Sequence, residues 1–341
     1  MKNKQVIFTN RPVGVPDESI WEYVESDVRD LEQDEFLIKN HYISLDPAMR
    51  GWMNDSRSYI APVQIGEVMR AGSVGEVIKS NNDGFKVGQF VSGWGGAQEF
   101  CISSGENYNK IYPGDIPLPT FLGYLGMPGM TAYFGILQEG EIKEGDMVLV
   151  SAAAGAVGSL VGQIAKIKGC RVVGIAGGKE KCDLLINELG FDDAIDYKNE
   201  NIYTSLKEKC PNGIDVYFDN VGGEISDNVI SNLSIGARIA ICGQISLYNL
   251  EENEKGDRVG STLLINQASM TGFLVFQFKS RYQEGLSKLS QWLLDEKIKY
   301  KEDIVSGKTG VRAMALSIEG DIIDDFKIAY SFILVYFNKL S

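Results

Sequence analysis

Four short apolar runs in the second half of the chain constrain its fold more than any other feature. They read MVLVS, RVVGIA, IDVYFDNV and RIAICG, and they alternate with segments that have helical spacing. Strands that alternate with helices pair in parallel, because each helix carries the chain back across a face of the sheet. The second half is therefore expected to form an α/β domain built on a parallel sheet.

The first part of the chain has a different pattern of apolar and polar residues. From about residue 5 to 112, apolar and polar residues alternate between glycine turns, as in AGSVGEVIKSNNDGFKVGQFVSGWGGAQEFCIS. This pattern predicts an antiparallel, barrel-like domain. The segment YPGDIPLPTFLGYLGMPGMTAYFGIL holds four of the nine prolines and marks the boundary. Because 341 residues exceed the usual size of one hydrophobic core, two domains are expected.

The composition argues against several kinds of partner. Hydrophobic residues make up 44% and charged residues 23%, as in ordinary globular proteins, and the net charge is -13. This charge would repel a phosphate backbone, and no run of Lys and Arg interleaved with aromatics offsets it, so no nucleic acid partner is expected. The amino terminus lacks the apolar segment of a signal peptide, and the apolar run IAYSFILVYF is too short to span a membrane. A cytoplasmic location without a membrane partner is expected.

The cysteines and the single histidine give little support to nucleophilic catalysis. The cysteines lie without a C-x-x-C pair, which argues against a disulfide framework and a zinc knuckle; they are Cys101, Cys170, Cys182, Cys210 and Cys242. A catalytic thiol needs a neighbouring base, and His41 lies in the alternating run DEFLIKNHYISL, which predicts a strand. A strand histidine is favoured over a Cys–His pair, which would depend on that one residue.

The run VLVSAAAGAVG leads from a predicted strand into a turn of small residues. After it, Val157, Val161, Ile164 and Lys168 have the spacing of one helix face, and Gly169 ends the helix. In this strand–turn–helix context, the backbone N–H groups at the start of the helix can hold a pyrophosphate if no Cβ blocks it.

The small residues of this turn match a dinucleotide-binding pattern. Gly155 and Gly158 take the second and third places of G-x-G-x-x-G, and Ala153 takes the first. We therefore predict cofactor contacts from this turn, at Ala153, Gly155, Ala156, Val157 and Gly158. A tight turn without a ligand is the alternative.

The residues after the second strand distinguish between the two nicotinamide cofactors. NAD sites usually carry an Asp or Glu there to accept the ribose hydroxyls. This chain has GIAGGKEK, in which Gly177 and Gly178 leave room and Lys181 supplies positive charge where a 2′-phosphate would sit. Tyr197, after the next predicted strand, could add a hydroxyl donor. The pattern predicts NADP(H), and a solvated surface lysine is the alternative interpretation of Lys181.

Several short sequence motifs, in the same order along the chain, resemble those of the medium-chain dehydrogenase/reductase superfamily. They are SLDPAMRGWM, IGEVMRAGSVGEVI, GMPGMTAYFGI, VSAAAGAVGSLVGQIAK, YFDNVGGE and RIAICGQISLYN, between about residues 36 and 303. Within the superfamily, the chain is similar to the zinc-independent branch of leukotriene and prostaglandin reductases and plant double-bond reductases.

The resemblance implies a two-domain fold. A GroES-like β-rich barrel would occupy residues 1–123 and be completed by residues 300–341. A Rossmann-type doubly wound parallel sheet would occupy residues 124–299 and bind the cofactor. Relatives often dimerise through their cofactor domains, so a homodimer is expected.

The resemblance also implies a reaction. Zinc-dependent relatives need a set of Cys, His and acidic ligands, but this chain has Glu67 where they place a histidine and lacks the four-cysteine cluster, so no metal is expected. The implied activity is NADPH-dependent reduction of the C=C bond of α,β-unsaturated ketones and aldehydes, with hydride added to the β-carbon. In this branch a tyrosine of the ISxYN word is the usual hydrogen-bond donor to the developing enolate, and it matches Tyr248.

Further site residues are carried over from the same words, although each of these side chains could equally serve core packing. Those expected to contact the cofactor are Met127 and Thr131 beside the nicotinamide, Asn220 near the adenosine end or the ribose, Cys242, and the strand-end residues Phe273, Leu274 and Val275. Those expected to line the substrate pocket are Tyr59 and Ala48, the latter in place of an aromatic residue of relatives.

The resemblance fails near the carboxyl terminus. Relatives carry a GxNxGK word whose asparagine contacts the cofactor, and the nearest alignment places Ile322 and Asp325 at its asparagine and lysine. From about Ser306 onward the similarity is poor. Either this segment has diverged or a reading-frame change has replaced it, and one cofactor contact is expected to be lost.

Two other functions remain open from the sequence. A quinone reductase shares the superfamily fold, although the words ISLYN and DPAMR favour the alkenal branch. A cofactor-binding protein with little turnover is compatible with the altered carboxyl terminus.

Overall fold

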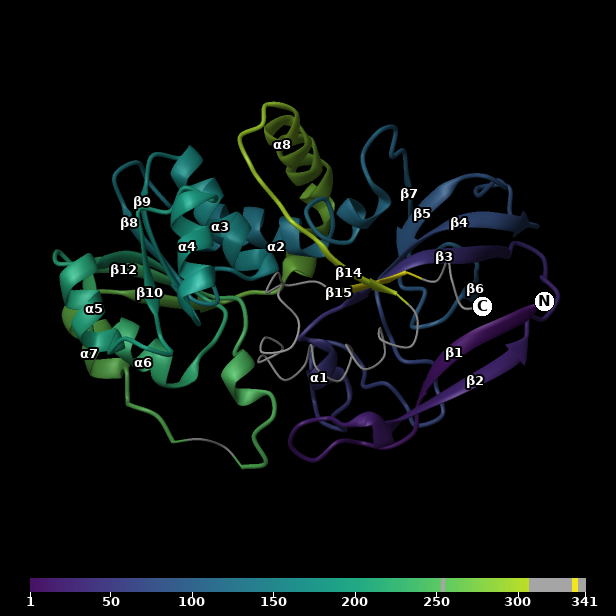
Figure 1. Ribbon diagram of the computed structural model, residues 1–341, viewed down its shortest axis with the longest axis horizontal. Helices are drawn as coiled ribbons and strands as arrows, with labels where there is room; N and C mark the ends of the chain where they lie inside the picture. The colour runs from purple at the N-terminus through teal and green to yellow at the C-terminus, as the bar shows by residue number, and fades with distance from the viewer. Residues whose placement is uncertain (253–254, 307–332, 337–341) are drawn as a thin grey trace. The chain divides into compact units, whose positions relative to one another are not determined.

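The computed structural model describes residues 1–252, 255–306 and 333–336, and these form two compact units (Figure 1). The first unit contains Met1–Gly123 and two later strands, and the second contains Tyr124–Lys301. The predicted completion of the first domain by residues 300–341 lies mostly outside the described residues. The aligned positions Ile322 and Asp325 also lie outside them.

The first unit is β-rich, and its strands pair as the sequence predicts. Its larger sheet has the order β14-β15-β3-β4-β5-β7, with β6 also paired to β3, and every pairing except that of β14 with β15 is antiparallel. An antiparallel ribbon of β1 and β2 stands apart from this sheet. The strands are β1 (Lys2–Phe8), β2 (Trp21–Asp27), β3 (Phe36–Leu45), β4 (Ser73–Ser80), β5 (Phe90–Gly93), β6 (Phe100–Ser103), β7 (Tyr108–Ile111), β14 (Asp303–Ser306) and β15 (Ile333–Tyr336).

Short helical turns connect these strands, and both aliphatic and aromatic side chains form the core. The turns are η1 (Glu18–Ile20), α1 (Met49–Trp52) and η2 (Leu118–Phe121). His41 lies in β3 as predicted, with its Nε2 3.7 Å from Glu76 Oε2. Burial lowers the pKa of His41, so the imidazole is neutral at neutral pH and behaves as a strand residue.

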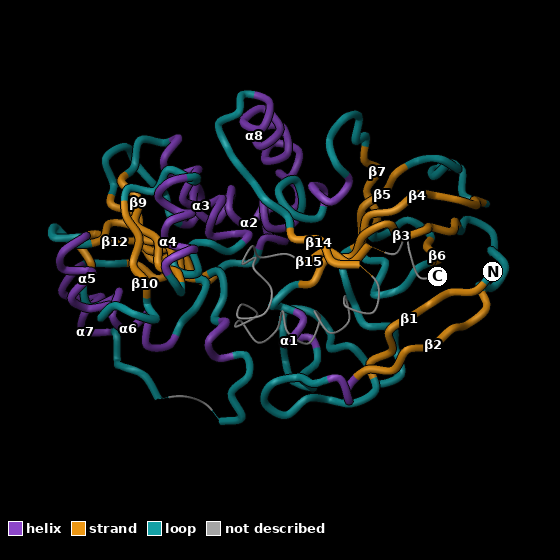
Figure 2. Tube along the Cα trace, viewed as in Figure 1, coloured by secondary structure: helices purple, strands orange, loops and turns teal. Residues whose placement is uncertain are grey.

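The second unit is built on a six-stranded sheet in which every pairing is parallel (Figure 2). The strand order is β10-β9-β8-β11-β12-β13, which is the order of a dinucleotide-binding doubly wound sheet. The four apolar runs of the sequence become β8, β9, β11 and β12, so the α/β prediction is confirmed. The strands are β8 (Met147–Val150), β9 (Arg171–Ala176), β10 (Asp193–Asp196), β11 (Ile214–Asp219), β12 (Leu233–Ile241) and β13 (Ser269–Gly272).

Helices cover both faces of this sheet, with α3 and α4 on one face and α5, α6 and α7 on the other (Figure 1). The helical elements are α2 (Met127–Phe134), η3 (Gly135–Glu139), α3 (Ala156–Ile167), α4 (Lys179–Asn187), α5 (Ile202–Lys209), α6 (Gly223–Ile230), η4 (Ile245–Leu247), α7 (Gly260–Asn266), η5 (Val275–Arg281) and α8 (Tyr282–Leu294). The sheet reverses direction between β8 and β11, and ligands of such folds bind at the carboxyl ends of the strands beside this reversal.

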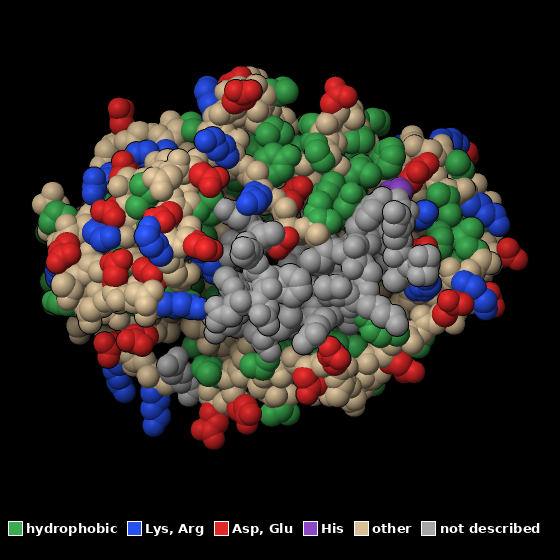
Figure 3. Space-filling view, in the orientation of Figure 1, with side chains coloured by type: hydrophobic (Ala, Val, Ile, Leu, Met, Phe, Trp, Pro, Cys, Tyr) green, Lys and Arg blue, Asp and Glu red, His purple; other side chains and the backbone are tan. Residues whose placement is uncertain are grey.

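The surface of the second unit carries charges of both signs. Figure 3 shows Lys and Arg side chains interspersed with Asp and Glu over the face in view. None of the helices in the described part of the chain is long and apolar enough to cross a membrane.

Close packing of α3 on its neighbours depends on a glycine. Val161 and Ile164 are buried on its inner face, as their spacing predicts. At Gly162 the ring of Phe191 lies against the helix backbone, and a Cβ there would overlap the ring.

Replacing Gly162 with alanine is expected to lower the free energy of unfolding by about 1–3 kcal/mol, because the Phe191 ring would be forced from its place. The matched control is Gly260→Ala at the first residue of α7, where a Cβ meets nothing within 4 Å among the described residues. Urea unfolding of both variants checks this. Equal stabilities would contradict the packing argument.

Candidate functional site

The residues predicted to hold a cofactor gather at one edge of the parallel sheet. Each of the six strands ends beside at least one of them, and parallel strands present their carboxyl ends on the same edge. In chain order they are Ala153 after β8, Gly177 after β9, Tyr197 after β10, Asn220 after β11, Cys242 after β12 and Phe273 after β13. Residues far apart in sequence are thereby collected along one crevice edge.

A buried carboxylate organises the point where the strand order reverses. Asp219, the last residue of β11, is 1% exposed. Its Oδ1 accepts hydrogen bonds from Tyr217 OH (2.7 Å), Ser151 Oγ (3.1 Å), Val221 N (2.9 Å) and Gly222 N (3.0 Å), and its Oδ2 accepts one from Ser226 Oγ (3.0 Å). Burial, and then the charge of Asp219, raise the pKa of Tyr217 well above its usual value, so the phenol stays a donor.

The backbone around Asp219 ties three strand ends together. Its carbonyl accepts the N–H groups of Cys242 (2.8 Å) and Gly243 (3.2 Å), at the end of β12. The side chain of Asn220 donates to the carbonyl of Ser151 (2.7 Å), at the end of β8. The ends of β8, β11 and β12 are thus fixed relative to one another, and the Asn220 amide is used in doing so.

The turn after β8 can accept an anion. The helix α3 begins after Gly155, and no side chain among the described residues caps its first turn. The unbonded N–H groups of a first helical turn, together with the helix dipole, suit a pyrophosphate. Gly158 lets the helix approach the turn, because a Cβ there would overlap the carbonyl of Ala152. The residues present therefore fit the phosphates of a dinucleotide.

The turn after β9 packs against the turn after β10. A Cβ at Gly177 would lie 2.9 Å from ring atoms of Tyr197, so the tyrosine ring rests where a side chain would otherwise be. Gly178 has φ of 93°, a conformation that favours glycine, and forms the N-cap of α4. Lys181 follows in the first turn of α4. The structure thus brings Gly177 and Tyr197 into contact, and the space beside Gly177 that the sequence analysis left for a larger group is occupied by the Tyr197 ring.

A pocket of about 420 Å³ lies beside Tyr197, at the carboxyl ends of β10 and β11. Its lining includes Val221, Gly222, Ile225 and Ser246 together with Tyr197. The volume falls within the range of roughly 300–1,000 Å³ that is usual for small-molecule sites. The lining also includes the polar side chains of Glu200, Asn201, Glu224 and Asn228, so the pocket is mixed in character and partly acidic.

Tyr248 lies beyond β12, at the C-cap of η4, and is half-buried. Its hydroxyl oxygen accepts the N–H of Gln244 at 3.4 Å and lies 3.2 Å from the place a Cβ of Gly243 would take. Its role as donor to the substrate stays a prediction, and a side chain at position 243 would require the phenol to shift slightly.

The residues expected near the nicotinamide lie on two other segments of the second unit. Met127 opens α2, and its carbonyl accepts the hydroxyl of Thr131 (2.8 Å). Phe273 is buried against Phe218, with ring centroids 6.0 Å apart. Its side chain therefore serves the core, while Leu274 is partly exposed and Val275 is buried.

The two residues expected to line a substrate pocket belong to the first unit. Tyr59 accepts a hydrogen bond from Trp52 Nε1 (3.0 Å) and is 48% exposed. Ala48 forms the N-cap of α1 and packs against the hydrophobic core of this unit.

Two buried carboxylates at the candidate site were not predicted from the sequence. Asp219 and Asp196 each end an apolar strand of the parallel sheet and are buried. An acidic residue directly after an apolar run, as in VYFD and DAID, is the signal that could have identified them, because parallel strand ends meet at the ligand-binding edge.

Comparison with known proteins identifies the family. Residues 4–111 match the family described as the N-terminal domain of oxidoreductase, and residues 156–291 match the family described as zinc-binding dehydrogenase. The NADPH-dependent curcumin reductase of Escherichia coli is 42% identical over 313 residues, which cover 90% of each protein. The chain belongs to the medium-chain dehydrogenase/reductase superfamily.

Other relatives place this superfamily member in the branch of alkenal, curcumin and prostaglandin reductases. The NADP-dependent 2-alkenal reductase of Nicotiana tabacum is 41% identical over 313 residues, covering 90% of this chain and 91% of the relative. The crystal structure of CurA in complex with NADPH from Vibrio vulnificus is similar in fold, with a TM-score of 0.91 and 42% identity, covering 98% of this chain and 99% of that one.

Among the described residues of this superfamily member, no three His, Cys, Asp or Glu side chains gather as metal ligands. Glu67, which the sequence analysis places where zinc-dependent relatives are expected to carry a histidine, is exposed and accepts the N–H of Gln64 (2.9 Å).

All five thiols are expected to react slowly with an aromatic disulfide reagent in the native protein. Burial raises the pKa of Cys242 to about 12, and it raises the pKa to about 11 for Cys101, Cys170, Cys182 and Cys210. The thiolate is the reactive form, so at pH 8 only about one thiol in a thousand is reactive, and the rate should rise with pH up to about 11.

Stopped-flow absorbance of native and urea-unfolded protein at several pH values measures this. The unfolded chain provides the control, because its thiols regain ordinary reactivity. A native thiol that reacts promptly at pH 7 would contradict the prediction and restore the case for a cysteine nucleophile.

Proposed function

We propose that this protein is a zinc-independent, NADPH-dependent reductase of the carbon–carbon double bond of α,β-unsaturated ketones and aldehydes. The observation that carries the proposal is the carboxyl edge of the parallel sheet. There the uncapped start of α3, the Gly177–Tyr197 contact and the loop bearing Tyr248 follow strands of one sheet. The names of the curcumin and 2-alkenal reductases and the NADPH-bound CurA structure support the same activity.

The chain's own residues provide binding and orientation. NADPH, when bound, supplies a hydride for the β-carbon of the substrate. The first turn of α3 would hold the pyrophosphate, while Lys181 and Tyr197 would contact the 2′-phosphate. Asn220, Cys242, Met127, Thr131 and the backbone of residues 273–275 would border the remainder of the cofactor, and Tyr59 and Ala48 would line the substrate pocket.

Tyr248 would stabilise the negative charge that builds on the substrate carbonyl oxygen. A phenol with an ordinary pKa of about 10 is protonated at neutral pH and can donate a hydrogen bond to that oxygen. The phenolic oxygen also accepts the backbone N–H of Gln244 (3.4 Å). No Lewis acid is required, because an alkene conjugated to a carbonyl is already an acceptor for hydride.

Loss of NADPH absorbance with a panel of a 2-alkenal, a phenylbutenone and a quinone tests this function. We expect turnover of the alkenal or the enone with NADPH and much less with NADH. Tyr248→Phe should lower kcat about 100- to 1,000-fold, as for removal of one oxyanion donor, with little change in NADPH affinity. Tyr112→Phe, at an exposed tyrosine of the first unit, is the control.

Two outcomes would overturn the proposal. A clear preference for the quinone would favour the quinone reductase alternative. Tight NADPH binding without turnover of any substrate would favour a cofactor-binding protein.

We further propose that the protein forms a homodimer through the outer strand of its parallel sheet. Among the described residues β13 is the last strand of that sheet, and edge strands present unpaired N–H and C=O groups. On the neighbouring helix α7, Leu264 and Ile265 are 79% and 74% exposed.

Light scattering should give a dimer, and the double variant Leu264→Glu, Ile265→Glu should give a monomer. A monomeric native protein, or a dimer lost equally in Val87→Glu, would contradict this interface.

A further inference from the structure

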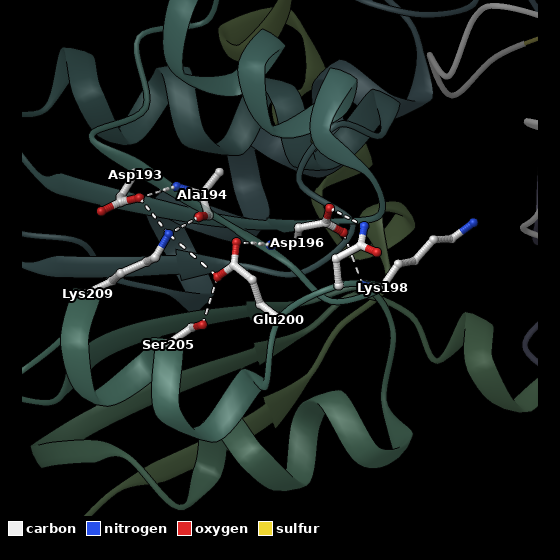
Figure 4. A network of polar contacts seen from close by, with 8 residues as sticks. Asp193, Ala194, Asp196, Lys198, Glu200, Ser205 and Lys209 are labelled. Atoms are coloured by element: carbon white, nitrogen blue, oxygen red, sulfur yellow. Dashed lines mark hydrogen bonds and ion pairs between the residues drawn. The ribbon is translucent and has the colours of Figure 1, made fainter.

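A second buried carboxylate lies at the edge of the sheet that the proposed site uses. Asp196 is the last residue of β10 and is 7% exposed. Its Oδ1 accepts the N–H groups of Gly178 (2.7 Å) and Lys198 (3.1 Å), and its Oδ2 accepts Asn199 Nδ2 (2.8 Å). Figure 4 shows this carboxylate turned toward the backbone of its own turn.

These hydrogen bonds join the two turns that would recognise the 2′-phosphate. The Gly178 N–H belongs to the turn after β9, which leads into the first turn of α4 and Lys181. The Lys198 N–H belongs to the turn after β10, directly after Tyr197. Asp196 therefore connects the Lys181 side of the site to the Tyr197 side, in addition to the packing of Tyr197 on Gly177.

The turn after β10 is also fixed from the side of α5. Glu200 Oε1 accepts the N–H of Asp196 (3.3 Å), and Glu200 Oε2 accepts the hydroxyl of Ser205 (2.8 Å). Lys209 Nζ lies 3.8 Å from Glu200 Oε2 and 3.0 Å from Asp193 Oδ1 (Figure 4). Glu200 and α5 thus hold the later part of this turn. At its start, the hydrogen bond from Gly178 to the Asp196 carboxylate sets the position of the turn relative to Gly178.

The charge of Asp196 is compatible with a neighbouring phosphate because it is already engaged. Burial alone would raise the pKa of Asp196, but hydrogen bonds from Asn199 and from the backbone of Gly178 and Lys198 outweigh it, and the pKa lies below its usual value. The group is therefore ionised at neutral pH. Its lone pairs face amide donors rather than the ribose hydroxyls that an acid accepts in NAD sites.

We propose that Asp196 is a positioning residue that sets the preference for NADPH over NADH by clamping the Gly178 turn to the Tyr197 turn. This inference rests on the proposed function. The clamp would hold Lys181 and Tyr197 at the separation that a 2′-phosphate requires, and NADH, which lacks this phosphate, would gain little from it.

Three variants separate this role from a merely structural one. Asp196→Ala removes the acceptor for Gly178. Asp196→Asn keeps one carbonyl oxygen that can accept from Gly178 and Lys198. Asp192→Ala is the matched control, because Asp192 lies just before β10, accepts the N–H of Val172 near the amino end of β9 (2.7 Å) and pairs with Lys166 of α3 (2.8 Å).

Fluorescence titration of each variant with NADPH and with NADH provides the first measurement. Asp196→Ala is expected to weaken NADPH binding about tenfold and to leave NADH binding within about twofold, as for loss of hydrogen bonds to a charged group. Asp196→Asn should stay within about threefold of the native protein for both cofactors. Asp192→Ala should lower stability without changing the ratio of the two affinities.

Hydrogen exchange without nucleotide provides a second measurement that does not depend on the proposed function. In Asp196→Ala the amides of residues 177–181 should exchange about tenfold faster than in the native protein, and in Asp192→Ala they should not. Unchanged exchange, or an equal loss of NADPH and NADH affinity in Asp196→Ala, would overturn the clamp while leaving the proposed reductase intact. A native protein that binds NADPH no better than NADH would overturn the proposed cofactor preference and the inference with it.

Discussion

Five hydrogen bonds to the buried carboxylate of Asp219 fix the point at which the strand order of the sheet reverses. A carboxylate removed from water without partners would cost several kcal/mol, so its donors must be in place whenever it is buried. The donors come from the end of β8, from β11, from the turn after it and from the start of α6. Burial of this one charge therefore requires that all of these segments come together. The carboxyl edge of the sheet is expected to form cooperatively for this reason.

Asp196 is a second buried, hydrogen-bonded carboxylate, at the end of β10, which β9 and β8 separate from β11 in the sheet. Both carboxylates lie beside a site proposed for an anionic cofactor, in a chain whose net charge is -13. Their oxygens are occupied by backbone amides and hydroxyls, so each negative charge is stabilised within the protein. In the proposed site, attraction for phosphate would depend on local groups, the first turn of α3 and Lys181, rather than on the overall charge.

The sequence predicted the parts of this structure that depend on local pattern. The run from β8 through the small-residue turn to α3 was predictable because strand periodicity, glycine placement and helix periodicity are each local. The shared edge of the site residues followed from parallel pairing. The clamp of Asp196 on Gly178 and the contacts of Asp219 with Ser151 were not predictable, because they join positions 18 and 68 residues apart that only the strand order makes neighbours. The Phe273 ring packs in the core, and its sequence could not distinguish that role from a cofactor contact.

Gly177 has two roles in the proposed site, and they are physically inseparable. With glycine at this position, the chain lacks the acidic side chain that accepts hydrogen bonds from the ribose hydroxyls in NAD sites. The absence of a side chain also makes room for the ring of Tyr197. Any side chain introduced at this position would meet that ring at about 3 Å and would have to displace it. Asp196 and Lys198 are the chain neighbours of Tyr197, so a displaced Tyr197 would also displace them. Asp196 Oδ1 accepts the N–H groups of both Lys198 and Gly178, and these two hydrogen bonds would be disturbed. The proposed cofactor preference therefore resides in a pair of packed turns, and an acid placed at residue 177 would disrupt NADPH recognition before it could build recognition of NADH.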